Sequence, residues 1–448
     1  MKDDRPETRP GSENLEPERT PSRPLPDFDG GVPGRPAAME VLRDGNFLRF
    51  LIGVFLVQLG AQMQNIAVGW EIYERTHSAL ALGMVGLAQV APVLLLAIPS
   101  GHLSDRYDRK RLFLASNVLM FLAAAGLSAA SAFGWPVGSI YAFLFLTGVG
   151  QALNRPARWA IQPTLVPRRL MLSAVTWNSS FWQTAAITGP ALGGLVIALA
   201  HSATACYALN TAFLACVIGL NAMLKVRPTA RDSGPVTIRT LLAGLRFVMK
   251  TEMLVAAMTL DLLAVLLGGA TALLPIFARD ILHVGPAGLG WLRAAPSIGS
   301  LSMAFLQTQR APLQRTGPVL LGAVAGFGVA TIVFGLSRNV YVSFAALLLT
   351  GAFDNISVVV RQTLTQMLTP DAMRGRVSAI NSIFIASSNE LGEFESGILA
   401  RFTGAVGAVV LGGLGALLTV IAVAALWPAL RRLGPLNDLK PADPETLP

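Results

Sequence analysis

The sequence is poor in charge. Only 14% of its 448 residues are Asp, Glu, Lys or Arg, whereas about 25% of a soluble globular protein is charged. Hydrophobic residues make up 53% of the chain, and the mean hydropathy is +0.55. Long stretches carry almost no charge. This composition excludes an ordinary soluble domain and predicts a polytopic membrane protein, in which about 20 apolar residues span a hydrocarbon core about 30 Å thick.

Residues and motifs that carry chemistry are scarce as well. Cys206 and Cys216 share one apolar segment, where a helix would hold them about 15 Å apart, too far for a disulfide. The sequence has no metal-ligand spacing, no catalytic triad and no Gly-rich loop followed by Lys-Ser/Thr. We therefore predict that the chain is not an enzyme, holds no metal or cofactor and does not hydrolyse ATP.

The net charge of +9 comes largely from Arg and Lys in short connectors. Cytoplasmic loops of membrane proteins are rich in these residues, and no folded basic domain remains to bind nucleic acid. On one side of the predicted helices the basic residues cluster, at 106–111, 168–169, 225–246, 310–315, 374–376 and 431–432. The other side has only single arginines. We expect both termini in the cytoplasm and the helices in a bacterial inner membrane.

The chain divides into five predicted parts. Residues 1–42 are rich in Pro, Arg, Glu and Asp and lack a signal-peptide core, which predicts a disordered cytoplasmic tail. A first six-helix bundle at 43–225, a cytoplasmic linker at 226–252, a second bundle at 253–432 and a tail at 433–448 follow. IRTLLAGLRFVMK in the linker has the pattern of an amphipathic helix on the membrane surface. The fold class is thus all-α and integral to the membrane, with twelve helices near 47–70, 79–101, 112–133, 138–158, 171–199, 203–224, 253–278, 287–308, 317–337, 340–362, 376–400 and 405–429.

The two bundles are related by an internal repeat. LTGVGQALNRPARWAIQPTLVP at 146–167 aligns without gaps with LTGAFDNISVVVRQTLTQMLTP at 349–370. Arg158 and Arg361 coincide in this alignment, which covers the same helix-to-loop transition in each half. Repeats of six helices in the same orientation are a known transporter architecture, with the substrate path between the halves.

A motif between the second and third helices carries a family resemblance. GHLSDRYDRKR at 101–111 resembles the signature G-x-x-x-D-R-x-x-R-K of the major facilitator superfamily, although Asp108 stands where the family often has Gly. WEIYERTHSALALGMVGLAQVAP, RPARWAIQPTLVP, GPALGG and LLAGLRF resemble its secretion-effector branch, which includes bacterial enterobactin exporters. The resemblance covers about 43–432. It implies two pseudo-symmetric bundles of the major facilitator fold and a siderophore-like or drug-like cargo.

The resemblance also implies a cytoplasmic gate, in which the signature loop latches the two halves together when the cavity faces outward. Arg158 and Arg361 lie at equivalent cytoplasmic helix ends, so we expect matched gate roles for them, with Asp105 or helix termini as partners. Contact with substrate is the alternative. The gate candidates are Gly101, Asp105, Arg106, Arg109, Lys110, Arg158 and Arg361. Positive-inside topology alone would explain the basic residues, but not Gly101 together with Asp105.

TGPALGG at 188–194 resembles the end of a motif in the fifth helix of antiporters, matched by Gly189, Pro190, Gly193 and Gly194. Small residues allow helices to approach closely, so plain packing is an equal alternative to an antiport role.

Amide side chains mark a predicted substrate cavity. Gln58, Gln62 and Asn65 follow each other at i, i+4 and i+7, which places them on one helix face. Asn178 and Trp182 repeat an i, i+4 pair on the fifth helix, and Asn389 extends the set on the eleventh. Polar groups in a membrane face protein or water, so we expect these residues to contact substrate. Hydrogen bonding between helices, away from any substrate, is the alternative.

Four carboxylates inside predicted helices are candidate proton carriers, because a charged carboxylate in a membrane is costly. Asp261 and Asp354 lie singly in the seventh and tenth helices, and a fixed salt bridge to Arg293 or Arg361 is the alternative. Glu390 and Glu393 share a face of the eleventh helix, about 60° apart. Arg293 lies at a similar depth to Glu393 and Glu395 and could pair with either, so a charge-paired hinge is the alternative to a proton site. Glu395 points away from both and is expected to reach outer water.

Taken together, these features predict a secondary transporter that works by alternating access and exports an amphipathic small molecule in exchange for protons. We expect a monomer whose partners are its substrate, protons and the lipid bilayer. An importer or uniporter on the same fold is the nearest alternative. A lipid translocator and a non-transporting membrane scaffold are alternatives of other classes.

Overall fold

A computed structural model describes residues 35–96, 99–100, 103, 107–226, 238–309 and 314–435. Within these ranges all regular secondary structure is helical. Nine of the described segments are long and apolar enough to cross a membrane. The long helices of the first half of the chain are α2 (Gly45–Thr76), α3 (Ala79–Leu95), α5 (Arg109–Ala132), α6 (Val137–Leu165), α7 (Met171–Ala200) and α8 (Thr204–Ala222). Those of the second half are α10 (Glu252–Leu267), α12 (Gly285–Thr308), α13 (Thr316–Leu336), α14 (Val340–Leu368) and α15 (Asp371–Leu426).

Polar side chains fix the starts of several helices. The Asp44 carboxylate accepts hydrogen bonds from the backbone N–H groups of Asn46 and Phe47 and so begins α2. Asp108 does the same for α5, through the N–H of Arg111 at 2.8 Å, and Asn339 for α14. Such caps satisfy N–H groups that the first turn of a helix leaves without partners. Asp108, the departure from the family signature, therefore has a local structural role.

Two helix boundaries in the second half can be compared with the prediction. The break between the last two predicted helices is confirmed, because Gly404 has φ 74° and ψ 167° inside the long α15. The segment predicted at 253–278 is one candidate membrane span, Glu252–Ile281, but it is not one continuous α-helix. α10 ends at Leu267 before the pair Gly268-Gly269, and the short elements η2 (Ala270–Leu273), α11 (Leu274–Ile276) and η3 (Phe277–Ile281) follow. Glycine is a poor helix former.

The predicted tail is wrong at its end, because α1 (Arg35–Arg43) is helical. Glu40 pairs with Arg169 at 2.5 Å, and Val41 is buried. Residues 1–34 of the tail lie outside the described ranges. In the linker, α9 (Ile238–Lys250) forms as predicted. It packs against α10 and α15, burying Phe247 and Val248.

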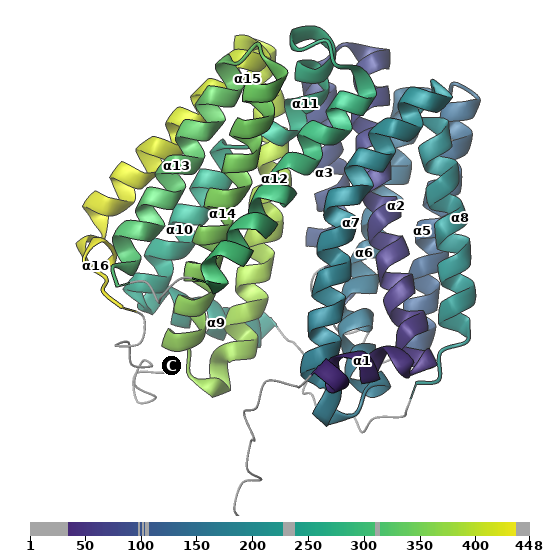
Figure 1. Ribbon diagram of the computed structural model, residues 1–448, viewed down its shortest axis with the longest axis horizontal. Helices are drawn as coiled ribbons and strands as arrows, with labels where there is room; N and C mark the ends of the chain where they lie inside the picture. Colours follow the sequence, from purple (N-terminus) through teal and green to yellow (C-terminus); the bar gives the residue numbers. More distant parts are fainter. Residues whose placement is uncertain are drawn as a thin grey trace, which may run out of the picture.

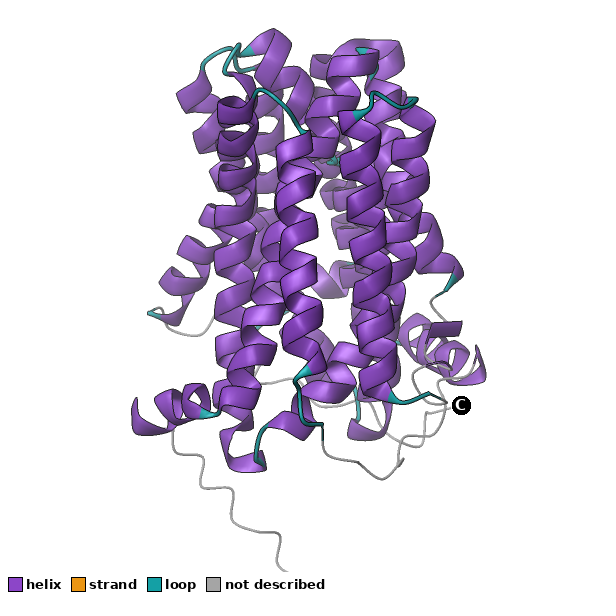
Figure 2. Ribbon diagram, turned by 90° about the vertical axis from the view of Figure 1, so that its right-hand side faces the viewer, coloured by secondary structure: helices purple, strands orange, loops and turns teal. Residues whose placement is uncertain are grey.

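The long helices run side by side in two groups (Figures 1 and 2). In Figure 1, α2 and α5–α8 of the first half lie on the right, and α10, α13 and α14 of the second half lie on the left. α9 and α1 lie at one end of the molecule, which we call the α9 end, and α11 lies towards the opposite, α11 end. The remaining short elements are η1 (Arg168–Leu170) and α16 (Pro428–Arg431).

Two helix pairs join the first half to the second: α7 packs on α12, and α3 packs on α15. Glycines allow both contacts. A methyl group on Gly194 would lie 2.9 Å from Cα of Gly290, and one on Gly397 would lie 2.7 Å from Cα of Gly83. Backbones this close leave no space for side chains. The contact between the halves is therefore built twice, once by each pair.

The glycines of the fifth-helix motif divide between two neighbours. Gly189 and Gly193 face α2, where added methyl groups would meet the carbonyl of Leu59 at 3.2 Å and Cα of Met63 at 2.9 Å. Gly194 faces α12 of the other half. The motif thus packs α7 against both halves.

Candidate transport cavity

A cavity of about 770 Å³ lies between the two halves. The first half contributes residues of α2, α6 and α7 to its wall, and the second half contributes residues of α10, α12, α14 and α15. Among the predicted site residues, the wall contains Gln62, Asn65, Trp182, Pro190, Asp261, Asp354, Arg361, Asn389, Glu390 and Glu393. The fold therefore brings all four predicted carboxylates to one space.

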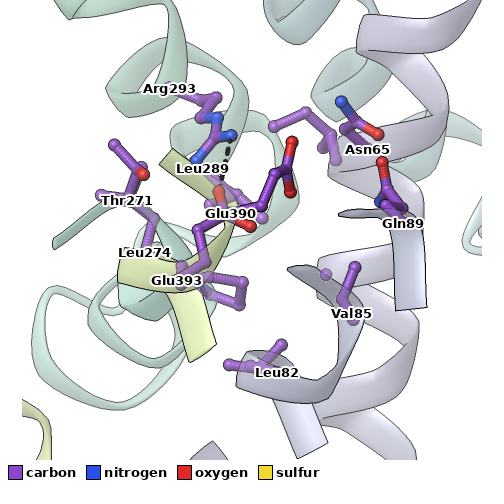
Figure 3. A pocket seen from close by; sticks show the side chains of 14 residues that line it. Asn65, Leu82, Val85, Gln89, Thr271, Leu274, Leu289, Arg293, Glu390 and Glu393 are labelled. Atoms are coloured by element: carbon purple, nitrogen blue, oxygen red, sulfur yellow. Dashed lines mark hydrogen bonds and ion pairs between the residues drawn. The ribbon is translucent and has the colours of Figure 1, made fainter. Parts of the chain in front are cut away.

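The two glutamates of α15 lie where the halves meet. Glu393 forms an ion pair with Arg293 of α12, with 3.4 Å between the Arg293 Nη2 and the Glu393 Oε1. Figure 3 shows Glu390 and Glu393 between Arg293 on one side and Asn65 and Gln89 of the other half. These residues line a recess of about 90 Å³ that shares its acidic residues with the large cavity. Glu395 is absent from both walls and accepts a long hydrogen bond from Ser396, at 3.5 Å.

A second acidic group lies between α10 and α14. Asp261 forms an ion pair with Arg361, and the Arg361 Nε donates to the Ser357 hydroxyl at 3.2 Å. Both charged residues are 8% exposed. Asp354 lines the same small pocket as Asp261 and Ser357. The salt bridge that the sequence left open as an alternative is present. Arg361 thus pairs with Asp261, because α14 faces α10 at this position. Asp105, the other expected partner, lies outside the described residues.

The first half has a pocket of its own, about 100 Å³ in volume, which we call the amide pocket. Its polar wall is formed by Gln58, Gln64, Thr147, Gln151, Asn154, Arg155, Arg158 and Asn210. The Arg158 guanidinium lies over the Trp182 ring, 5.4 Å from its centroid. Trp182 and Arg155 also line the large cavity, so the two spaces adjoin.

Other predicted residues lie elsewhere. Gln58 lines the amide pocket rather than the large cavity, whereas its companions Gln62 and Asn65 line the large cavity. Asn178 lines neither space, and its buried Oδ1 has no hydrogen-bond partner among the described residues. Arg109 donates to the Ala160 carbonyl at 3.4 Å and Lys110 to the Ala222 carbonyl at 2.7 Å. The gate candidates Gly101, Asp105 and Arg106 lie outside the described ranges.

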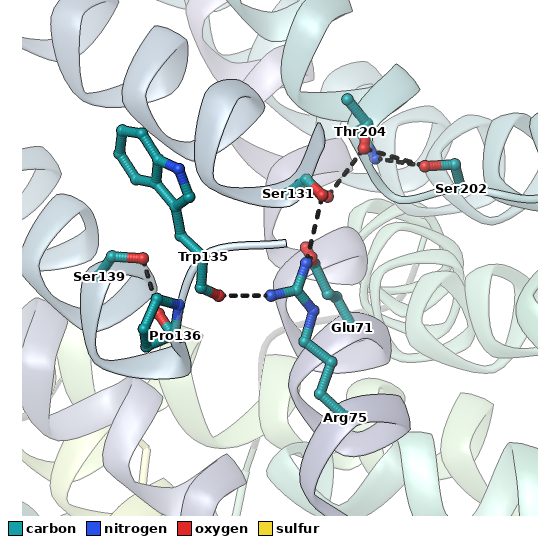
Figure 4. Close-up of polar contacts among 8 residues, drawn as sticks. All are labelled: Glu71, Arg75, Ser131, Trp135, Pro136, Ser139, Ser202 and Thr204. Carbon is teal, nitrogen blue, oxygen red and sulfur yellow. Dashed lines mark hydrogen bonds and ion pairs between the residues drawn. The ribbon is translucent and has the colours of Figure 1, made fainter. Parts of the chain in front are cut away.

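Contacts at the α11 end were not predicted. The Tyr73 hydroxyl of α2 donates to the Asp280 carboxylate of η3, which links the two halves. Nearby, Arg75 pairs with Glu71 at 2.5 Å and donates to the Trp135 carbonyl at 2.8 Å and the Ser131 carbonyl at 3.3 Å (Figure 4). The spacing of Glu71 and Arg75, at i and i+4, was a readable sign of an ion pair. The Tyr73–Asp280 contact had no such sign, because its partners lie 207 residues apart.

A comparison with known protein families identifies the family of this chain. The family described as transmembrane secretion effector matches residues 37–442. The chain belongs to this family. Secretion effectors of this type are major facilitator transporters, so the chain is a multi-pass membrane transporter of the major facilitator type.

Relatives include the enterobactin exporter EntS of Citrobacter koseri, 28% identical over 374 residues that cover 83% of this chain and 85% of the relative. EntS of Escherichia coli O1:K1 is 27% identical over 372 residues, with the same coverage. The resemblance inferred from the signature loop and from RPARWAIQPTLVP is thereby confirmed.

Solved structures share the fold of this secretion effector. A POT family transporter in complex with 5-aminolevulinic acid superposes with a TM-score of 0.68 at 12% identity, covering 86% of this chain and 96% of that one. An inward-facing bacterial homologue of the human lysosomal transporter Spinster has a TM-score of 0.65 at 14% identity, covering 90% and 98%. At such identities the likeness concerns the fold alone.

Proposed function

We propose that this secretion effector exports an amphipathic small molecule across the bacterial inner membrane in exchange for protons. The observation that carries the proposal is the position of Glu390 and Glu393, at the wall of a cavity between two helix groups and opposite Asn65. A carboxylate within the membrane-spanning part changes the charge of the cavity when it gains or loses a proton, and the ionised form is costly there. Gain or loss of a proton at this wall therefore changes the electrostatic free energy of any ligand bound in the same cavity.

Alternating access is the second part of the proposal. Twelve spans in two six-helix bundles, at 43–225 and 253–432, would rock against each other about the α7–α12 and α3–α15 contacts. The glycines at those contacts support it, because smooth backbone surfaces can separate and close again. The basic connectors support cytoplasmic termini, with the α9 end inside. The chain carries both halves of the cavity, so a monomer suffices.

The cargo is proposed from the relatives. Both named relatives are enterobactin exporters, which favours a siderophore-like molecule and favours export over import. A cavity of about 770 Å³ is within the range of sites for drug-sized ligands. In the signature loop, Arg109 and Lys110 tie the start of α5 to carbonyls of α6 and α8. We assign the loop to the cytoplasmic gate.

Transport in inside-out membrane vesicles tests the proposal, with enterobactin as the probe. The vesicle lumen corresponds to the cell exterior, so an acidic lumen should drive accumulation of the probe, and a protonophore should abolish it. Glu393→Gln should lose the dependence on the gradient, whereas Glu395→Gln, outside both cavity walls, should keep it. Accumulation that ignores the gradient would indicate a uniporter, and gradient-driven movement out of the lumen would indicate an importer. Either result would contradict the proposal.

A further inference from the structure

The two halves place polar residues at equivalent positions beside equivalent arginines. Arg158 and Arg361 are related by the internal repeat. The same separation in sequence relates Gln58 to Asp261, Gln151 to Asp354 and Asn154 to Ser357. Gln58, Gln151, Asn154 and Arg158 lie together in the amide pocket, and Asp261, Asp354, Ser357 and Arg361 lie together between α10 and α14.

These two sets of residues differ in charge. In the second half Arg361 is neutralised by Asp261. In the first half both carboxylate positions hold amides, which cannot neutralise a guanidinium. Among the described residues, neither Arg155 nor Arg158 forms an ion pair. The Trp182 ring and the like-charged Arg155 lie near Arg158, and Glu390 interacts with Arg155 only at longer range. The wall of the amide pocket contains no carboxylate.

Donors in the amide pocket are also unused. Asn154 donates to Ser116 at 2.9 Å and to Asn117 at 3.1 Å, and Asn210 donates to Gln64 at 2.7 Å. These bonds hold the back of the pocket. Gln58 and Gln151, by contrast, have no side-chain hydrogen bond to any described residue. Two guanidinium groups and two amides without internal partners therefore converge on one space that contains no carboxylate.

We propose that the amide pocket is the subsite for an anionic oxygen group of the exported molecule, a carboxylate or an ionised phenol. Arg155 and Arg158 neutralise the anion, since charge-assisted hydrogen bonds from guanidinium to such groups are strong and directional. Its volume of about 100 Å³ fits such a group alone. The rest of the molecule extends past Trp182 into the large cavity, which Arg155 and Trp182 also line.

This inference rests on the proposed transport of a small molecule, but binding can be measured without transport. The full chain is placed in nanodiscs of phosphatidylcholine, and 2-naphthoate is titrated against its neutral isostere 2-naphthamide by calorimetry. Naphthoate should bind and naphthamide should bind at least tenfold more weakly. Arg158→Gln and Arg155→Gln should each weaken naphthoate binding about tenfold or more, as expected for loss of a charged hydrogen bond.

The repeat supplies a sharper variant, Gln58→Asp, which places the second-half carboxylate beside Arg158. It should weaken naphthoate binding about as much as Arg158→Gln, although both arginines remain. Glu395→Gln, outside the walls of the amide pocket and the large cavity, should leave it within about threefold. Unfolding midpoints and size-exclusion profiles identify variants that misfold, and Arg155→Gln then stands in for them. Equal binding of naphthoate to wild type, Gln58→Asp and the arginine variants would overturn the proposal.

A lipid headgroup offers the same anionic chemistry, so a second arm uses nanodiscs of phosphatidylglycerol. Naphthoate binding that persists there supports the cargo subsite. Binding that disappears there, with retention of phosphatidylglycerol that depends on Arg158, would overturn it in favour of a lipid. Naphthoate binding that depends on the pocket in a protein that moves no enterobactin would sustain the subsite and refute the proposed export.

Discussion

The two halves of this transporter share a repeat with an arginine at the same position, and they differ in the charge of the residues around that arginine. Both place an arginine at the same point of the repeat, Arg158 of α6 in the amide pocket and Arg361 of α14 at the wall of the large cavity. The second half supplies carboxylates at the two positions where the first half has Gln58 and Gln151. Arg361 is thus part of an internal ion pair, whereas the pocket around Arg158 supplies no carboxylate to pair with it. Duplication followed by divergence at a few positions can separate a proton-handling wall from an anion-binding wall within one cavity.

The largest expected effect comes from breaking the ion pair of the second half. Asp261→Asn leaves Arg361 without its partner at 8% exposure, and loss of one member of a buried pair costs about 3 kcal/mol. The equivalent change in the first half, Gln58→Leu, should cost less than about 1 kcal/mol, because Gln58 has no side-chain hydrogen bond to lose. Denaturation of both variants in detergent measures the difference. The double variant Asp261→Asn/Arg361→Gln should recover much of the loss, and equal destabilisation by the two single changes would remove the contrast between the pockets.

Substitutions at the two contacts between the halves, α3–α15 and α7–α12, should have similar effects, whereas substitutions at equivalent positions of the two pockets should not. Gly83→Val and Gly194→Val each place a side chain where a methyl group would already lie within 3.0 Å of the facing backbone. Each should prevent closure at that helix pair and lower the transport rate at least tenfold. Gly219→Val on α8, where nothing lies within 4 Å, is the matched control and should transport normally. A large effect at only one of the two pairs would show that the halves do not close symmetrically.

A smaller effect is expected at the α11 end. Tyr73→Phe removes the hydrogen bond to Asp280 that links the halves, and a hydrogen bond to a charged group contributes about 1.5 kcal/mol. The equilibrium should shift about tenfold towards opening at that end. The separation of the two helix groups at this end can be measured by cross-linking or by spin-label distances between a residue of α2 near position 73 and a residue of η3. Thr76→Val, which removes only local bonds, one donated to the Ile72 carbonyl and one accepted from the Ser78 N–H, should leave the distances unchanged.

Much of this architecture could be predicted from the sequence because its signals are periodic or repeated. The apolar runs predicted the long helices, and the gap left between the last two, at 401–404, contains the non-helical Gly404. The repeat pointed to the equivalence of Arg158 and Arg361. Helix depth alone placed Arg293 near Glu393, and the ion pair is present.

The features that were not predicted depend on which neighbouring helix packs against a given helix face at a given depth in the membrane. Gln58 shares a face of α2 with Gln62 and Asn65, yet it lies about 6 to 10 Å nearer the α9 end. There the side chain meets α6 residues of its own half instead of the large cavity. The break after Leu267 was missed because Gly268-Gly269 lies within a segment whose high mean hydropathy continues to Ile281. Hydropathy responds to apolar residues and not to backbone conformation.

The central claim is that the second half handles protons and the first half handles cargo. Its most direct test is enterobactin transport by reconstituted protein, with rate and KM measured at several imposed pH gradients. Glu390→Gln/Glu393→Gln should abolish the dependence of the rate on the gradient while exchange of enterobactin at equal pH continues. Arg155→Gln/Arg158→Gln should raise KM at least tenfold and keep the gradient dependence. Loss of both properties together in each double variant would contradict a division of labour between the halves.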